Sequence, residues 1–222
     1  MTSTLTRKRS LKARLVTGAA AAAVVSLVSI APAHAAVTIS QGHVDAVDVD
    51  WTGSALTLDL RDSTVSPAVD RNPADVVLNA VSASKTTVPS NSAYSFLGTA
   101  GAPVWILPQT QNSNLVWPGF STEGVPSGAL QNNSVTVRLV SASGPADVSV
   151  FTTNSFGTPT VWYDSGNGLP DNRSFPVNTH AHANWAFEAA GTYTLVFEGT
   201  ATTAAGASVT TGQKTYTFTV QP

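Results

Sequence analysis

The histidines are the residues whose types and spacing point most directly to chemistry. The sequence has four histidines, and three of them form two short motifs: His43 lies two residues before Asp45, and His180 and His182 form a His-x-His motif. Histidine is the commonest metal ligand in proteins. In an extended strand, side chains two residues apart project from the same face, so the rings of His180 and His182 can converge on one ion. We therefore predict a metal site.

The predicted ligand set consists of His43, His180 and His182, with Asp45, another carboxylate or water as the fourth ligand. Three imidazole nitrogens and a carboxylate suit zinc, whereas copper and manganese fit less well, and calcium and magnesium prefer cages of oxygen atoms. The set assembles only if the two histidine motifs meet in space, which their spacing does not decide. The alternative is that these histidines are polar residues on a strand surface.

No motif in the chain predicts catalysis. The sequence lacks His-Glu-x-x-His, Gly-x-Ser-x-Gly and any cysteine nucleophile. A zinc enzyme also needs an open coordination position and a general base, and nothing in the sequence fixes Glu123 or Glu188 beside the histidines. We therefore expect a protein that is not an enzyme and has no catalytic residues.

A second hypothesis uses the aromatic residues instead of the histidines. Trp105, Trp117 and Phe120 could form a contact surface for a protein or a glycan. The chain would then be a structural or adhesive extracellular module in which the histidines are incidental. Tryptophans in a small β-rich domain also serve as core residues, so the sequence allows either use of these side chains.

The first 36 residues have the pattern of a secretory signal peptide. A basic region at residues 7–14 precedes an apolar run at 15–30, and Ala33-His34-Ala35 offers a small-x-small cleavage site. Five of the eleven basic residues and none of the thirteen acidic ones lie in this segment, so the remainder has a net charge of −7. We expect an extracellular protein, secreted or associated with the cell surface, with no transmembrane segment and no affinity for nucleic acid.

Residues 37–222 are expected to form one all-β domain. Cysteine is absent, and short segments with alternating apolar residues are separated by Gly, Pro, Asn and Ser. Val47, Val49 and Trp51, a turn at 52–54, and Leu56, Leu58 and Leu60 predict a β-hairpin. Further strands are expected at 75–81, 104–107, 134–140, 147–152, 160–163, 183–188, 192–198 and 213–220, and a long loop at 108–128. The pattern favours an immunoglobulin-like antiparallel β-sandwich.

Several ordered motifs also carry a resemblance to a known family. They are Gly42-His43-Val44-Asp45, 94–98 (Tyr-Ser-Phe-Leu-Gly), 104–110 (Val-Trp-Ile-Leu-Pro-Gln-Thr), 117–123 (Trp-Pro-Gly-Phe-Ser-Thr-Glu), Ser143-Gly144-Pro145, 180–187 (His-Ala-His-Ala-Asn-Trp-Ala-Phe) and Gly191-Thr192-Tyr193. Together these motifs resemble the actinobacterial surface-anchored repeat domain, also called the choice-of-anchor M domain. The resemblance covers nearly all of residues 37–222.

The resemblance implies a secreted or wall-attached module associated with metal uptake. Domains of this family are often encoded beside a metal-type ABC transporter and its metal-binding lipoprotein, which are therefore the expected partners. The context implies acquisition of zinc or manganese. The last residues, 217–222, contain no sorting signal, so we expect release, or retention by a partner, in place of covalent attachment to the wall.

Overall fold

The structure is a computed structural model that describes Met1, Thr2, Thr4 and residues 36–222. The signal peptide predicted for residues 1–36 lies almost wholly outside the described residues. Among the residues that are described, no helix has the length and apolar character needed to cross a membrane.

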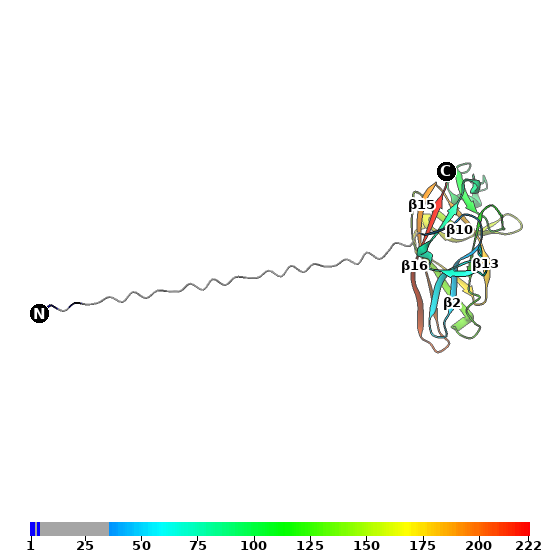
Figure 1. Cartoon of the computed structure of the whole chain (residues 1–222). Coiled ribbons are helices and arrows are strands. Elements are labelled where there is room, and N and C mark those ends of the chain that lie inside the picture. The colour runs from blue at the N-terminus through cyan, green and yellow to red at the C-terminus, as the bar shows by residue number, and fades with distance from the viewer. Residues whose placement is uncertain (3, 5–35) are drawn as a thin grey trace. The chain divides into compact units, whose positions relative to one another are not determined.

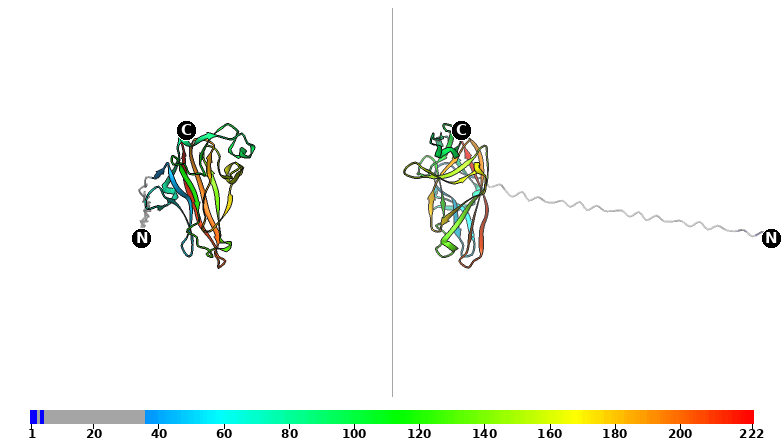
Figure 2. Two further views of the ribbon diagram at one scale, coloured as in Figure 1. Left: turned by 90° about the vertical axis from the view of Figure 1, so that its right-hand side faces the viewer. Right: turned by 180° about the vertical axis from the view of Figure 1, so that it is seen from behind.

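Residues 36–222 form sixteen strands and five short 3-10 helices, so the predicted all-β class is confirmed. The strands make three sheets, which we call sheets A, B and C. Figures 1 and 2 show that the long strands β15 and β16, in orange and red, run along much of the domain. An immunoglobulin-like strand order stays a prediction.

Sheet A has six strands in the order β1-β5-β16-β15-β9-β12. It contains two parallel pairs, β1 with β5 and β5 with β16, and is otherwise antiparallel. The strand bounds are β1 Val37–Ile39, β5 Val76–Ala80, β16 Ser208–Val220, β15 Gly191–Thr202, β9 Ser134–Ser143 and β12 Asp171–Pro176.

Sheets B and C have five strands each, in the orders β13-β8-β2-β3-β4 and β11-β10-β14-β7-β6. In sheet B the bounds are β13 His180–His182, β8 Val116–Ser121, β2 Gly42–Trp51, β3 Leu56–Asp62 and β4 Val69–Arg71. In sheet C they are β11 Pro159–Asp164, β10 Val148–Thr153, β14 Asn184–Phe187, β7 Pro103–Leu107 and β6 Lys85–Thr87. The 3-10 helices are η1 Pro73–Asp75, η2 Ser82–Ser84, η3 Ser92–Leu97, η4 Gln131–Asn133 and η5 Ser165–Asn167.

One aromatic core joins the three sheets. Phe120 of sheet B stacks on Trp185 of sheet C with ring centroids 5.2 Å apart, and its ring meets Phe197 of sheet A edge-on at 6.2 Å. Trp185 in turn stacks on Phe218 of sheet A at 5.3 Å. Burial of these large rings and of the aliphatic residues around them is the main force that holds a disulfide-free domain together.

The predicted hairpin is confirmed: β2 and β3 pair antiparallel around a turn in which Thr52 and Ala55 are hydrogen-bonded. Each of the eight further strand predictions overlaps an observed strand. The prediction of a continuous loop over 108–128 is wrong, because β8 crosses this segment. Pro118 and Gly119 make this strand hard to predict from the sequence, since both residue types are rare inside strands. At Pro118, β8 pairs with β2 alone, because its pairing with β13 begins at Gly119.

Candidate metal centre

The outer face of sheet B brings both histidine motifs together, although their strands are not neighbours. Strand β8 lies between β2 and β13, parallel to β2 and antiparallel to β13. Gly119 of β8 is in register with Asp45 on one side and with His182 on the other. Because side chains two residues apart share a face, His43 and His180 flank this row on the same surface. The four predicted metal ligands therefore meet.

The ligand atoms of His43, Asp45, His180 and His182 all lie within 4.8 Å of one another. The Nε2 atom of His180 is 3.2 Å from Nε2 of His43 and 3.1 Å from Nε2 of His182. The Oδ1 atom of Asp45 is 2.8 Å from Nε2 of His180 and 3.5 Å from Nε2 of His43. We call this group the His3Asp cluster.

Four of the six separations within the cluster are close to the edges of a tetrahedral zinc site. Ligands held about 2.0–2.1 Å from zinc in tetrahedral geometry are about 3.3 Å apart. The four separations given above range from 2.8 to 3.5 Å. A single proton on Nε2 of His180 can satisfy only one of its three close neighbours, whereas one cation would accept a lone pair from all four groups. The residues therefore fit a zinc ion.

Burial differs sharply across the cluster. The Asp45 side chain is 4% exposed and its Oδ1 has no hydrogen bond of good geometry, while the His43 and His180 side chains are 22% and 33% exposed. Nδ1 of His182 is also buried, with the backbone of Pro118 as its polar neighbour and no well-formed hydrogen bond. The cluster therefore has an inner side formed by Asp45 and His182 and an outer side that solvent reaches.

Gly119 provides the space in which the ligands converge. A Cβ atom at this position would lie 2.9 Å from Oδ1 of Asp45 and 2.9 Å from Cε1 of His182. Both distances are shorter than real Cβ contacts, so any other residue would push the ligands apart. Sequence reasoning missed this role, because the register of three strands is needed to place Gly119 beneath the cluster.

Trp117 forms a wall of the site. Its ring stacks on the imidazole of His182, with centroids 3.6 Å apart and planes at 9°, and its Nε1 donates a hydrogen bond of 2.9 Å to the carbonyl of Gln109. The backbone N–H of Gln109 donates to Oδ1 of Asn184, two residues after His182. This chain of contacts fixes the orientation of the His182 ring. The sequence predicts Trp117 as a contact residue, and the structure places it against the His3Asp cluster.

The other two predicted contact residues lie in the core. Trp105 is 5% exposed and Phe120 is 2% exposed, so the prediction that they present a contact surface is wrong. Phe120 points inward from β8 and stacks on Phe175 and Trp185. Phe120 falls in the segment predicted as a loop, and Trp105 in a strand that is predicted correctly. In both strands the large ring turns toward the buried interior.

Burial and neighbouring groups shift the pKa values of His182, His43 and Asp45. Desolvation, followed by the neighbouring His43 and His180, lowers the pKa of His182 to about 4. Desolvation also lowers the pKa of His43, against the opposing effect of Asp45. Burial raises the pKa of Asp45, partly offset by His180 and His43. His182 is therefore a neutral imidazole at pH 7, the form that binds metal.

Two further carboxylates lie on the same face. Oε2 of Glu123 is 3.9 Å from Nδ1 of His180, the ring nitrogen outside the cluster. Asp48 is in register with Ser121, which is in turn in register with His180, and burial raises the Asp48 pKa to about 6. The face around the site is therefore acidic, which favours the approach of cations.

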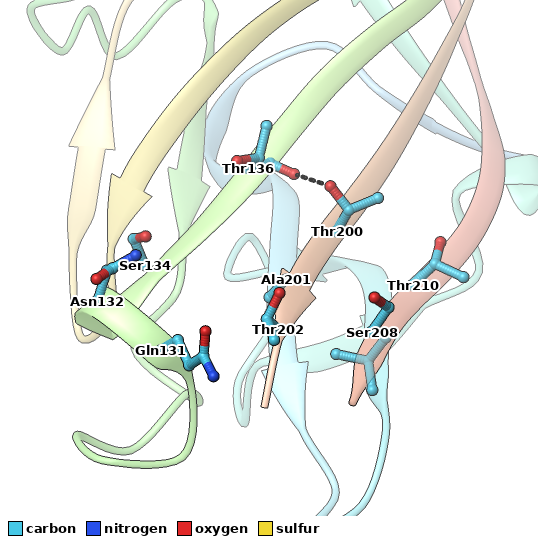
Figure 3. Close-up of a pocket in the computed structure, with 10 residues that line it drawn as sticks. Gln131, Asn132, Ser134, Thr136, Thr200, Ala201, Thr202, Ser208 and Thr210 are labelled. Carbon is cyan, nitrogen blue, oxygen red and sulfur yellow. Dashed lines mark hydrogen bonds between the residues drawn. The ribbon is translucent and has the colours of Figure 1, made fainter. Parts of the chain in front are cut away.

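A separate cavity of about 480 Å³ lies over strands β9, β15 and β16 of sheet A and the adjoining helix η4 (Figure 3). It is lined mainly by hydroxyl and amide side chains, among them Gln131, Thr136 and Thr200. None of the residues of the His3Asp cluster lines this cavity. It adds no titratable group and no metal ligand to the candidate site.

Comparison of the chain with protein-family models, curated proteins and solved structures finds no match. The resemblance to the surface-anchored repeat domain therefore stays a prediction. Fold and geometry by themselves define an all-β protein with a cluster of three histidines and one aspartate that could hold a metal ion.

Proposed function

We propose that this protein is an extracellular β-sandwich module that binds one zinc ion through His43, Asp45, His180 and His182. The observation that carries the proposal is the convergence of four ligand atoms within 4.8 Å of one another, with four of their six separations close to those of a tetrahedral zinc site. The lowered pKa of His182 supports it, because a neutral ring binds the cation without first losing a proton.

Zinc is favoured over other metals by ligand type and geometry. Three nitrogen donors are unfavourable for calcium and magnesium, and manganese prefers six mainly oxygen ligands. Copper(II) prefers a tetragonal arrangement, whereas the contacts around Nε2 of His180 suit a compact tetrahedron. Copper is the second choice, because imidazole is also a good copper ligand.

A role in binding is favoured over catalysis. Catalytic zinc sites keep one coordination position for water or substrate, whereas structural sites use four protein ligands. The His3Asp cluster offers four protein ligands. The partly exposed His43 and His180 leave the ion within reach of solvent, which suits a protein that captures or presents the metal.

Export and partners rest on the sequence alone. The signal-peptide pattern in residues 1–36 supports an extracellular location at or near the cell surface. The resemblance to the surface-anchored repeat domain supports a role in metal uptake beside a metal-binding lipoprotein or an ABC transporter. We also propose an immunoglobulin-like topology, on the basis of the strand pattern in the sequence.

A calorimetric zinc titration of metal-stripped protein tests the binding proposal. We expect one tight site per chain, and its loss in the double variant His180→Ala/His182→Ala with the fold retained by circular dichroism. Asn167→Ala, which changes the η5 turn outside the cluster, is the control variant and should bind zinc as the wild type does. Stoichiometric binding that survives in the double variant would overturn the site assignment. No binding in the wild type would favour the structural or adhesive alternative.

A further inference from the structure

His180 has a carboxylate on the side that faces away from the cluster. Its Nε2 lies among the other ligands, and its Nδ1 is 3.9 Å from Oε2 of Glu123. Glu123 follows β8 by two residues, and its backbone N–H donates a hydrogen bond of 3.3 Å to Oγ of Ser121, which is in register with His180. Strand pairing therefore places Glu123 beside this one ligand.

The chemistry of a bound ion gives this carboxylate a role. A histidine that binds metal through Nε2 carries its proton on Nδ1, and metal-bound histidines nearly always donate that N–H to a carboxylate, a carbonyl or water. Zinc with three neutral imidazoles and one carboxylate leaves a net charge of +1 on the site. Within residues 36–222, Glu123 is the acidic group in ion-pair range of Nδ1 of His180.

We propose that Glu123 is a positioning residue that accepts the Nδ1–H of His180 when the cluster holds zinc, and that it thereby slows the release of the metal. The inference rests on the proposed zinc site. The Glu123 side chain is 59% exposed, so it is free to move the roughly 1 Å that separates the present distance from that of a charge-assisted hydrogen bond. This bond would fix both the tautomer and the ring orientation of His180.

The acidic face provides a matched control. Asp50 and Glu123 both line a cavity of about 260 Å³ beside the cluster, together with Asp48, Arg61, Ser121 and Gly124. Asp50 contributes negative charge to this face but forms no ion pair with His180 among the described contacts. A general electrostatic effect would therefore appear in Asp50→Asn and Glu123→Gln alike, whereas a hydrogen bond to His180 depends on Glu123 alone.

The test measures the rate at which zinc leaves the loaded protein when excess chelator is added. We expect Glu123→Ala to release zinc about 10–100-fold faster than the wild type. Glu123→Gln keeps an acceptor oxygen and loses the charge, so its rate should be intermediate. Asp50→Asn should stay within about twofold of the wild type. Equal effects of Asp50→Asn and Glu123→Gln would overturn the positioning role.

Nuclear magnetic resonance of the histidine rings supplies a readout that a merely structural role would not move. In the zinc-loaded wild type, the Nδ1–H proton of His180 should be visible at pH 7, because a hydrogen bond protects it from exchange. In Glu123→Ala it should exchange rapidly and disappear. An unchanged proton signal together with unchanged release would overturn the inference. A wild type that binds no zinc would overturn the proposed function instead.

Discussion

His182 and Asp45 are the two ligands that the protein has removed furthest from water. Burial works in opposite directions on them: it lowers the pKa of the imidazole and raises the pKa of the carboxyl, so both neutral forms are favoured. A divalent cation reverses the preference of Asp45, because it stabilises the carboxylate. The pair is thus poorly solvated without a cation and well matched to one.

The buried carboxyl of Asp48 leads to a prediction about the stability of the folded protein. This residue is 4% exposed, and burial raises its pKa to about 6. A carboxyl whose folded pKa exceeds its unfolded value of 3.8 contributes stability below pH 3.8, and this contribution is lost as the pH rises through 6. Asp48→Asn should therefore stabilise the zinc-free protein at pH 7.5 by about 1–3 kcal/mol.

Urea unfolding at two pH values measures this effect. At pH 4 most of the difference between Asp48→Asn and the wild type should vanish, because Asp48 is then largely protonated and neutral in the folded protein. A variant that is less stable than the wild type at pH 7.5 would contradict the prediction. It would mean that the charged form of Asp48 is held by favourable contacts with Ser121.

The sequence predicts the residues of the His3Asp cluster but not their surroundings. His43, Asp45, His180 and His182 stand out because histidine is scarce in this chain and because residues two apart share a face of a strand. Nothing in the residue types marks Gly119 as the gap beneath the cluster, Trp117 as the ring against His182, or Glu123 as the neighbour of His180. Those roles arise from the pairing of strands far apart in sequence.

Strand β8 is the element that makes the cluster. It separates β2 from β13, and its outward residues alternate between the ring of Trp117 and the empty position of Gly119. The side chains of β2 and β13, the strands on either side of β8, converge above Gly119, since glycine places no side chain between them. A bulge in β2 after Asp45 then keeps Asp48 on the same face.

The substitution Gly119→Ala tests whether the gap at this position is needed for zinc binding. Because the added methyl would lie 2.9 Å from both Asp45 and His182, we expect zinc affinity to fall about 10–100-fold, which is about 1.4–2.8 kcal/mol. Calorimetric titration gives the affinity, and thermal unfolding of the zinc-free variant shows whether the fold persists. Wild-type affinity in a folded Gly119→Ala protein would show that the gap at this position is not needed.

At the element scale, strands with regular apolar alternation were predictable and irregular ones were not. The hairpin of β2 and β3 follows from its paired runs of valine and leucine around a polar turn. Strand β8 has Pro118 and Gly119 at its centre, so its sequence resembles a loop. Its identity depends on the parallel pairing with β2, a long-range contact that no local pattern reveals.

The aromatic core of the domain lies against the face of sheet B that is opposite the His3Asp cluster. The inner face of sheet B packs into an aromatic core shared with sheets A and C, through Phe120, Trp185 and Phe197. The outer face of sheet B carries the four side chains of the His3Asp cluster. A metal ion there would link His43 and His180, which are 137 positions apart in the sequence. Binding would therefore add to the stability of the domain as the zinc concentration rises.

The most direct test of the central claim is the zinc X-ray absorption spectrum of protein loaded with one equivalent of metal. We expect four nitrogen or oxygen neighbours at about 2.0–2.1 Å, with the outer-shell scattering of three imidazoles. The same spectrum of His180→Ala/His182→Ala should lose most of the imidazole signal. A shell of six oxygen neighbours with one imidazole or none in the wild-type protein would contradict a zinc site made by His43, Asp45, His180 and His182.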